Sequence, residues 1–210
     1  MNSIQFGQYH AYNDLGLILK KKEIGSPEPK KMQIEVEGRD GVLDYTEYFG
    51  DIKYNNRVLK FDFVMLQSPF LSAYSTINDA LHGKVVRITL DEDSSYYYLG
   101  RLSVSPFTND KNIGSISIEC DCEPYKYKQN ETTVTRAVSG SDTIILTNSR
   151  KRVVPLITTT ASMTIGFNGN TYNVEAGTFT IPELELVEGS NTVTVTGTGN
   201  ITFKYQEGRL

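Results

Sequence analysis

The residues that could carry out chemistry are few in this chain. It has two histidines, His10 and His82, and two cysteines among 210 residues. General acid–base catalysis usually relies on a histidine or a carboxylate whose pKa is shifted inside a pocket. His82 stands beside Gly83 at the end of a predicted helix, where the helix C-terminus would stabilise a protonated ring as a cap. The sequence has no nucleophile-elbow, phosphate-loop or zinc-protease motif, so we predict no catalytic residue and no cofactor.

Metal binding is the second chemistry to consider. Cys120 and Cys122 are two positions apart, so on a strand they share one face, with Cα atoms near the upper limit for a disulfide. Neither histidine lies at ligand spacing from them, and we interpret both as small buried apolar side chains. The run Asp91-Glu92-Asp93 does not have the spacing of an EF-hand loop. We therefore predict no metal site and interpret this run as a solvated hairpin turn.

Composition narrows the function classes further. The net charge of −4 argues against a dedicated nucleic-acid binder, which needs cations to neutralise phosphates. No apolar run approaches the roughly 20 residues of a membrane-spanning helix. The first residues do not combine a basic segment with an apolar one, so we predict neither a secretory signal nor membrane insertion.

The elements that would position a site centre on residues 36–65. Gly38 and Gly41 bracket Arg39 and Asp40, and glycine reaches positive φ without a steric penalty, so we predict a tight loop with this charged pair at its tip. A turn is predicted at residues 54–57 because of its two asparagines. The strand that follows should bury one face, since its apolar residues alternate: Leu59, Phe61, Phe63 and Met65.

Other patterns complete a mainly β first domain with one short helix. Apolar residues alternate with Gln33, Glu35 and Glu37 over 32–37, which predicts a strand with an acidic outer face. A helix is predicted from Pro69 or Ser72 to Gly83, with four residues on its buried face: Phe70, Tyr74, Ile77 and Leu81. Gly100 indicates a bulge or a close backbone approach within a strand. The clearest amphipathic strand covers residues 115–123.

The composition changes after Tyr127, where threonine, glycine and valine become frequent. Turn signals then recur every eight to twelve residues, as in sandwiches and barrels. Asn168-Gly169 is the strongest hairpin signal. We also predict turns at residues 188–191 and 197–200, and we expect domains at 1–128 and 129–210.

Several short motifs resemble the N-terminal region of the distal tail proteins (Dit family) of long-tailed phages and prophages. They occur in order over about the first 128 residues: Phe6-Gly7, His10, Asp14-Leu15-Gly16-Leu17, Gly38-Arg39-Asp40-Gly41, Leu43-Asp44, Thr46-Glu47, Gly50, Tyr54-Asn55-Asn56-Arg57, Phe61, Phe63 and Glu123-Pro124-Tyr125-Lys126-Tyr127. Each motif is short, whereas their order and spacing together are fairly specific.

The resemblance implies a structural role rather than an enzymatic one. It implies an N-terminal β-sandwich or split-barrel-like domain with a packed helix that builds a homohexameric ring, and a galectin-like C-terminal β-sandwich outside it. The implied partners are the major tail protein and the tail-tip, tail-associated or receptor-binding proteins. The implied location is the virion tail tip, after assembly in the bacterial cytoplasm. A negative chain would also suit a ring whose channel passes DNA without gripping it.

Seven residues are the candidate subunit interface: Gly38, Arg39, Asp40, Gly41, Asp44, Tyr54 and Arg57. The residues alone fit surface loops with weak ion pairs equally well, and the resemblance favours the interface. Two other functions stay open. A carbohydrate-binding module would use exposed aromatics of the second domain, which has five and no tryptophan: Phe167, Tyr172, Phe179, Phe203 and Tyr205. A wall-degrading hydrolase would need an acid–base constellation that the sequence does not display.

Overall fold

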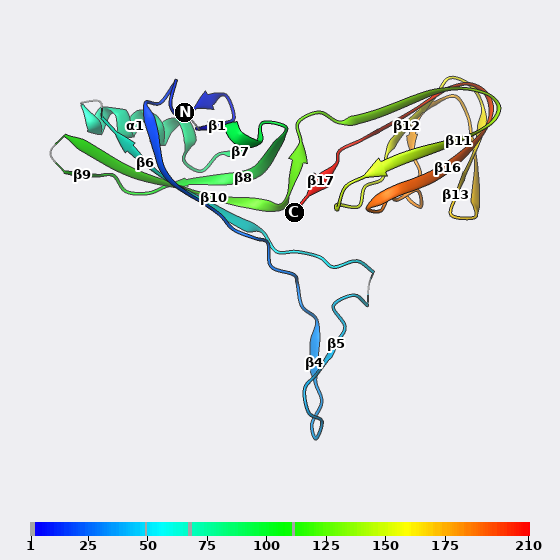
Figure 1. Cartoon of the computed structure of the whole chain (residues 1–210), viewed down its shortest axis with the longest axis horizontal. Coiled ribbons are helices and arrows are strands. Elements are labelled where there is room, and N and C mark those ends of the chain that lie inside the picture. The colour runs from blue at the N-terminus through cyan, green and yellow to red at the C-terminus, as the bar shows by residue number, and fades with distance from the viewer. Residues whose placement is uncertain (1–2, 49, 67–68, 111) are drawn as a thin grey trace. The chain divides into compact units, whose positions relative to one another are not determined.

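The computed structural model describes residues 3–48, 50–66, 69–110 and 112–210 (Figure 1). Its contacts divide the chain into two compact units, Met1–Lys126 and Tyr127–Leu210, which we call unit 1 and unit 2. The division falls two residues before the boundary placed after residue 128 from the sequence. Strands dominate both units, and the described residues contain one α-helix, so the mainly β fold class is confirmed.

Unit 1 is built on one antiparallel sheet. Its strands are β1 (Ile4–Phe6), β2 (Tyr9–His10), β3 (Leu17–Ile24), β6 (Arg57–Met65), β7 (Val85–Leu90), β8 (Tyr96–Val104), β9 (Thr108–Asp110) and β10 (Ile113–Lys128). The order across the sheet is β2-β1-β7-β8-β10-β6-β3, and β9 also pairs with β10. A short 3-10 helix, Asp91–Asp93, connects β7 to β8 where the acidic turn was predicted.

The core of unit 1 follows the predicted alternation in β6 and β10. Ile118 lies opposite Phe61, and Cys120 lies opposite Leu59, so these side chains share the inner face. Phe61 and Ile118 have no exposed surface. Full burial of such a side chain is worth about 1.5–3 kcal/mol, which makes this pair of strands the centre of unit 1.

Helix α1 (Phe70–Leu81) covers the inner face of this sheet, as predicted. Pro69 occupies its N-cap position, and Ile77 and Leu81 are buried. Phe70 and Tyr74 pack their rings against Phe107 at centroid distances of 6.0 and 5.8 Å. After the C-cap residue His82, the chain reverses at Gly83 with φ +76°. A glycine is needed there because other residues adopt positive φ only at a steric cost.

Unit 2 is a curved antiparallel sheet around its own core. Its strands are β11 (Thr132–Asn148), β12 (Leu156–Thr159), β13 (Met163–Phe167), β14 (Asn170–Val174), β15 (Gly177–Thr180) and β16 (Gly189–Tyr205). The short strand β17 (Gly208–Arg209) lies outside this sheet and pairs with β10. Strand β16 pairs with β11 along its whole length. On its other edge, β16 pairs with β13 over residues 194–197 and with β12 over residues 201–204.

The predicted turn at residues 197–200 is wrong, because β16 continues through it. Gly197 lies directly opposite Gly140 of β11, and their φ angles are +152° and +91°. The two glycines therefore let both long strands bend at the same level, as Figure 1 shows for β11 and β16. By contrast, Asn168 and Gly169 have φ values of +48° and +81° and form the predicted hairpin turn between β13 and β14.

Candidate subunit interface

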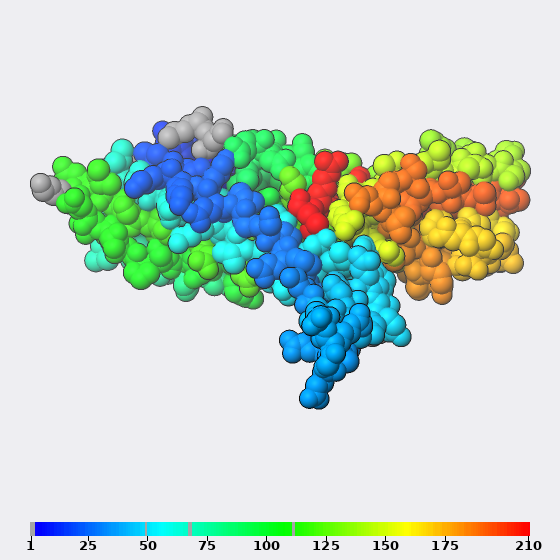
Figure 2. Space-filling view, turned by 60° about the horizontal axis from the view of Figure 1, so that its bottom comes forward, coloured from blue at the N-terminus to red at the C-terminus, as the bar shows by residue number. Residues whose placement is uncertain are grey.

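Residues 25–56 form a long excursion between β3 and β6, which we call the arm. Its two sides are joined by backbone hydrogen bonds, such as the Lys30 amide to the Lys53 carbonyl at 2.7 Å and the Tyr45 amide to the Met32 carbonyl at 2.7 Å. Its outer part is the hairpin of β4 (Gln33–Glu35) and β5 (Val42–Asp44), which pair only with each other. Figures 1 and 2 show the arm extending away from the sheet of unit 1.

The tip of the arm has the predicted tight loop. Gly38 and Gly41 have φ values of +79° and +75°, and the Arg39 amide donates to the Val36 carbonyl at 3.1 Å. Arg39 and Asp40 lie between the two glycines, and both side chains are exposed. The glycines therefore shape the loop, while the charged pair is presented to the surroundings.

The sides of the arm expose apolar residues. Ile34 lies opposite Leu43, and by alternation Met32 and Val36 share their face. Met32, Ile34 and Val36 are 43%, 46% and 42% exposed. The predicted strand over 32–37 was expected to bury these residues, and in the single chain that expectation is wrong. A two-stranded hairpin of this kind is only marginally stable alone in water.

Asp44 has a local role at the base of the hairpin. Its Oδ1 accepts the Thr46 amide at 2.9 Å, and the Thr46 hydroxyl accepts the Met32 amide at 3.1 Å. Hydrogen bonds from the Thr46 side chain and backbone lower the Asp44 pKa. Asp44 thus fixes the turn that follows β5.

Tyr54 and Arg57 lie at the root of the arm, and the turn predicted for residues 54–57 is wrong. Tyr54 forms an isolated bridge with Pro29 and packs edge-on against Tyr125, with ring centroids 6.0 Å apart. Arg57 begins β6, is 5% exposed, and holds its guanidinium 5.5 Å above the Tyr98 ring. The seven candidate residues therefore lie in three separate places: the tip of the arm, the base of its hairpin, and its junction with β6. Only the tip residues 38–41 lie next to one another.

The exposed apolar residues of the arm are the feature that the sequence interpretation missed. Their alternation was visible, but it was taken as a sign of burial within the same domain. Pro27 and Pro29 before this stretch and the two glycines of the tip after it could have indicated a segment set apart from the other strands.

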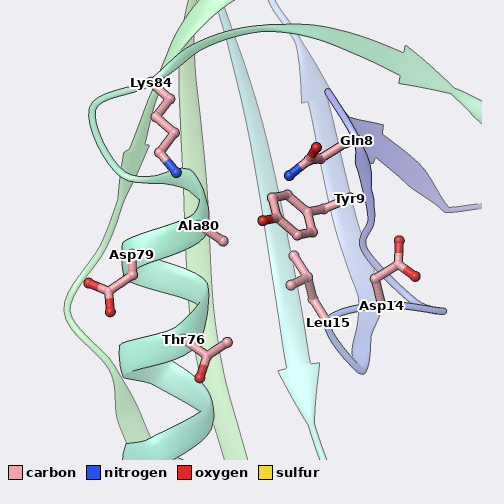
Figure 3. Close-up of a pocket in the computed structure, with 8 residues that line it drawn as sticks. All are labelled: Gln8, Tyr9, Asp14, Leu15, Thr76, Asp79, Ala80 and Lys84. Atoms are coloured by element: carbon pink, nitrogen blue, oxygen red, sulfur yellow. The ribbon is translucent and has the colours of Figure 1, made fainter.

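A pocket of about 660 Å³ lies elsewhere in unit 1, between α1 and the segment that joins β1 to β3 (Figure 3). Tyr9 and Leu15 project toward the helix, whereas Asp79 and Asp14 lie on opposite sides of the group. Asp14 accepts the His10 amide at 2.6 Å.

The two histidines have structural hydrogen bonds. His82 Nδ1 accepts the Val104 amide at 3.1 Å, and His10 Nδ1 accepts the Asn13 amide at 3.1 Å. His82 is the C-cap residue of α1, at the helix end where the sequence placed it. Its hydrogen bond ties the end of α1 to β8.

The cysteines are buried, and the acidic residues of the segment between β7 and β8 have hydrogen-bond or ion-pair partners. Cys120 and Cys122 are free thiols with no exposed surface, and burial raises the pKa of both, that of Cys122 to about 12. Asp91 accepts the Ser3 amide at 3.0 Å, and Asp93 pairs with Lys126 at 2.7 Å. Within the described residues, no three His, Cys, Asp or Glu side chains gather as a metal site.

The aromatic residues of unit 2 lie within its core. Phe167, Phe203 and Tyr205 are at most 4% exposed, while Tyr172 and Phe179 pack against the same cluster. Three of the five aromatic side chains are thus buried, and the other two are partly buried against the same core.

The described residues define a mainly β protein with two units and a hairpin arm that exposes apolar residues. No helix among the described residues is both long enough and apolar enough to cross a bilayer. No protein-family model matches the chain, and no curated protein matches it.

A solved structure has the same architecture. The SPP1 Dit (gp 19.1) protein, presented as a paradigm of the hub adsorption apparatus in phages that infect Gram-positive bacteria, matches with a TM-score of 0.72 at 16% sequence identity. The match covers 100% of both chains. At this identity the likeness establishes a shared fold across unit 1 and unit 2.

Proposed function

We propose that this chain is a distal tail protein, a structural subunit of a phage tail that forms a hexameric ring. The observation that carries the proposal is the arm, whose apolar face has no cover in the single chain. The full-length likeness to a phage Dit protein and the sequence motifs of its family support it. In this role the chain performs no chemistry and acts by assembly.

A closed ring explains how the arm could be covered without leaving a free end. In a cyclic arrangement each copy gives its arm to one neighbour and receives an arm from the other. Such a head-to-tail contact uses two different surfaces of the same chain. Every arm in the ring is then covered, and no further copy can be added.

The magnitudes favour cooperative assembly over a simple dimer. Met32, Ile34 and Val36 are already about half covered, so their complete burial would contribute roughly 1 kcal/mol each, from about 1.5–3 kcal/mol for full burial. Association costs about 4–15 kcal/mol in lost freedom. One arm contact alone is therefore weak, whereas a closed ring combines several.

The proposed division of labour follows the two units. Unit 1, with the arm, would build the ring, and unit 2 would lie outside it as a galectin-like domain. The ring would join the major tail protein to the tip, tail-associated or receptor-binding proteins at the virion tail tip, after assembly in the host cytoplasm. The net charge of −4 suits a channel that lets DNA pass.

Light scattering over a wide concentration range tests the proposal. We expect a species near six times the chain mass of 23.5 kDa. The matched control joins Lys30 to Lys53 through an Asn-Gly turn, because their backbones already meet at 2.7 Å. This shortened variant should stay folded and monomeric. A wild-type monomer at every concentration, or a ring formed equally well without the arm, would contradict the proposal.

A further inference from the structure

One edge of the sheet in unit 1 is fastened to the 3-10 helix between β7 and β8, which we call the acidic turn (Asp91–Asp93). Strands β1 and β2 form this edge. The Ser3 amide donates to Asp91 Oδ2 at 3.0 Å, and the Asp91 amide donates to the Ser3 carbonyl at 3.1 Å. His10 Nε2, at the end of β2, lies 3.4 Å from the same Oδ2 atom. Asp91 therefore holds the start of β1 and the end of β2.

The opposite edge of the sheet is β3, and its end reaches the same acidic turn. Lys22 forms an ion pair with Glu92, 70 positions away along the chain. The start of β3 is held differently, because the Leu17 amide donates to the Ala11 carbonyl at 2.8 Å across the short connection from β2. The chain itself therefore holds the start of β3, whereas Glu92 holds its end.

A β-bulge in β3 turns Lys22 toward the inner face of the sheet. The register of β3 against β6 shifts just after Leu19, where Lys20 is the extra residue. After the shift, Lys22 lies opposite Phe61, whose side chain is fully buried. Strict alternation from Leu19 would instead have placed Lys21 on this face. The bulge therefore aims one lysine of the run toward the acidic turn.

The third carboxylate fixes the acidic turn to the middle of the sheet. Asp93 pairs with Lys126 of β10 at 2.7 Å, and Lys126 Nζ lies 4.9 Å from the centroid of the Tyr96 ring. Strand β10 lies between β8 and β6 in the sheet. The acidic turn is thus anchored on a central strand, while its other two carboxylates reach the two edges.

We propose that the acidic turn is an ionic strap, which joins the two edges of the unit 1 sheet and keeps the end of β3 closed. An edge strand is paired on one side, so its end opens more easily than a central strand. When the Lys22–Glu92 pair is broken, residues 21–24 open locally while the rest of the sheet stays folded. Since the arm begins directly after Ile24, the strap also limits the movement of the arm against the sheet.

Hydrogen exchange of the full chain tests the strap, with Glu92→Gln as the variant. We expect the amides of residues 21–24 to exchange about two- to fivefold faster, which is the effect of losing one partly exposed ion pair. The amides of β10 should keep their wild-type rates. Glu23→Gln is the matched control, because its partner Lys21 belongs to the same strand. After correction for intrinsic rates, this control should exchange like the wild type.

A charge exchange separates the ion pair from other effects of the substitution. Lys22→Glu alone and Glu92→Lys alone should each accelerate exchange at residues 21–24 more than Glu92→Gln does, because like charges then face each other. The two changes combined in one chain should restore the protection. In about 1 M salt, where the screening length is about 3 Å, the difference between the wild type and Glu92→Gln should shrink.

Three outcomes would overturn the strap: unchanged exchange at residues 21–24 in Glu92→Gln, equal acceleration in Glu23→Gln, or no recovery in the exchanged pair. Faster exchange throughout unit 1 would also overturn it, because the acidic turn would then belong to the cooperative core. Light scattering of each variant under the same conditions reports its assembly state separately. A hexamer with unaltered β3 exchange would leave the proposed function standing and remove the strap, and a monomer with the expected pattern would do the reverse.

Discussion

Strands β6 and β4 share one sequence pattern and have opposite environments. In β6 the alternating apolar residues Leu59, Phe61 and Phe63 are at most 1% exposed, whereas Ile34 in β4 and its flanking residue Val36 are more than 40% exposed. The difference lies in their neighbours, because β6 is flanked by β3 and β10 and β4 is flanked only by β5. Alternation thus shows that a face needs a cover, while the topology decides whether the same chain supplies it.

Among changes to the buried strand β6, Phe61→Ala should have the largest effect on the free energy of unfolding. Phe61 has no exposed surface and packs against Phe6 at a centroid distance of 5.9 Å. Removing a buried phenylalanine costs about 3–5 kcal/mol, since the cavity collapses only partly. Hydrogen exchange should show this loss in unit 1 and not in unit 2. Equal weakening of both units would mean that they do not unfold independently.

A smaller change on the covered side is Gly100→Ala in β8. An added Cβ would lie 2.5 Å from Cys122 Sγ and 2.7 Å from the Asp121 carbonyl oxygen. Forcing β8 and β10 apart should cost about 1–3 kcal/mol. Urea denaturation followed by hydrogen exchange measures it, with Ser103→Ala on the exposed face of the same strand as control. An unchanged Gly100→Ala variant would show that the close approach is not needed.

On the uncovered side, Ile34→Asp should leave the folded monomer almost unchanged. Ile34 is 46% exposed, and surface substitutions usually change the free energy of unfolding by less than about 0.5 kcal/mol. Assembly should nevertheless weaken about tenfold or more, equivalent to about 1.4 kcal/mol. Ile145→Asp is the matched control, since Ile145 of unit 2 is 61% exposed. Equal effects of both variants on the mass in solution would remove the special role of the arm.

The sequence predicts the parts of the fold that depend on local signals. These signals lie within a few residues of one another. They are the alternation of β6 and β10, the three- and four-residue spacing in α1, and the Asn168-Gly169 turn. Gly100 was also recognised as a place of close approach, because glycine inside a strand has few other uses.

The wrong predictions concern residues whose structure depends on a contact far away in the sequence. Residues 197–200 look like a turn until Gly140 is known to lie opposite Gly197, far away along the chain. Arg57 looks like a surface residue until Tyr98 is placed beneath its guanidinium. For the candidate interface, the tip loop was predictable from its two glycines. The exposed apolar face was not, because alternation does not tell whether the same chain covers the face.

The same comparison between buried and exposed groups can be made for two carboxylates of unit 2. Here we expect the smallest change in the free energy of unfolding. Burial of Glu207 in unit 2 disfavours its ionised form and raises its pKa. Hydrogen bonds from Thr132, Lys128 and Ser149 outweigh this effect and lower the pKa below its ordinary value. Its side chain is 13% exposed, and the Lys128 Nζ and Ser149 Oγ donors lie at 2.9 and 2.8 Å.

A lowered pKa in the folded state means that Glu207 stabilises unit 2 above its unfolded pKa. This contribution, at most about 1 kcal/mol because Lys128 is partly exposed, is lost as the pH falls through the folded pKa. Glu207→Gln should therefore flatten the loss of unit 2 stability below about pH 4.5, measured by urea denaturation at successive pH values. Glu188→Gln, at an exposed pair with Arg150, should retain the wild-type slope. Equal slopes for all three proteins would show that the buried hydrogen bonds of Glu207 do not contribute to the acid sensitivity of unit 2.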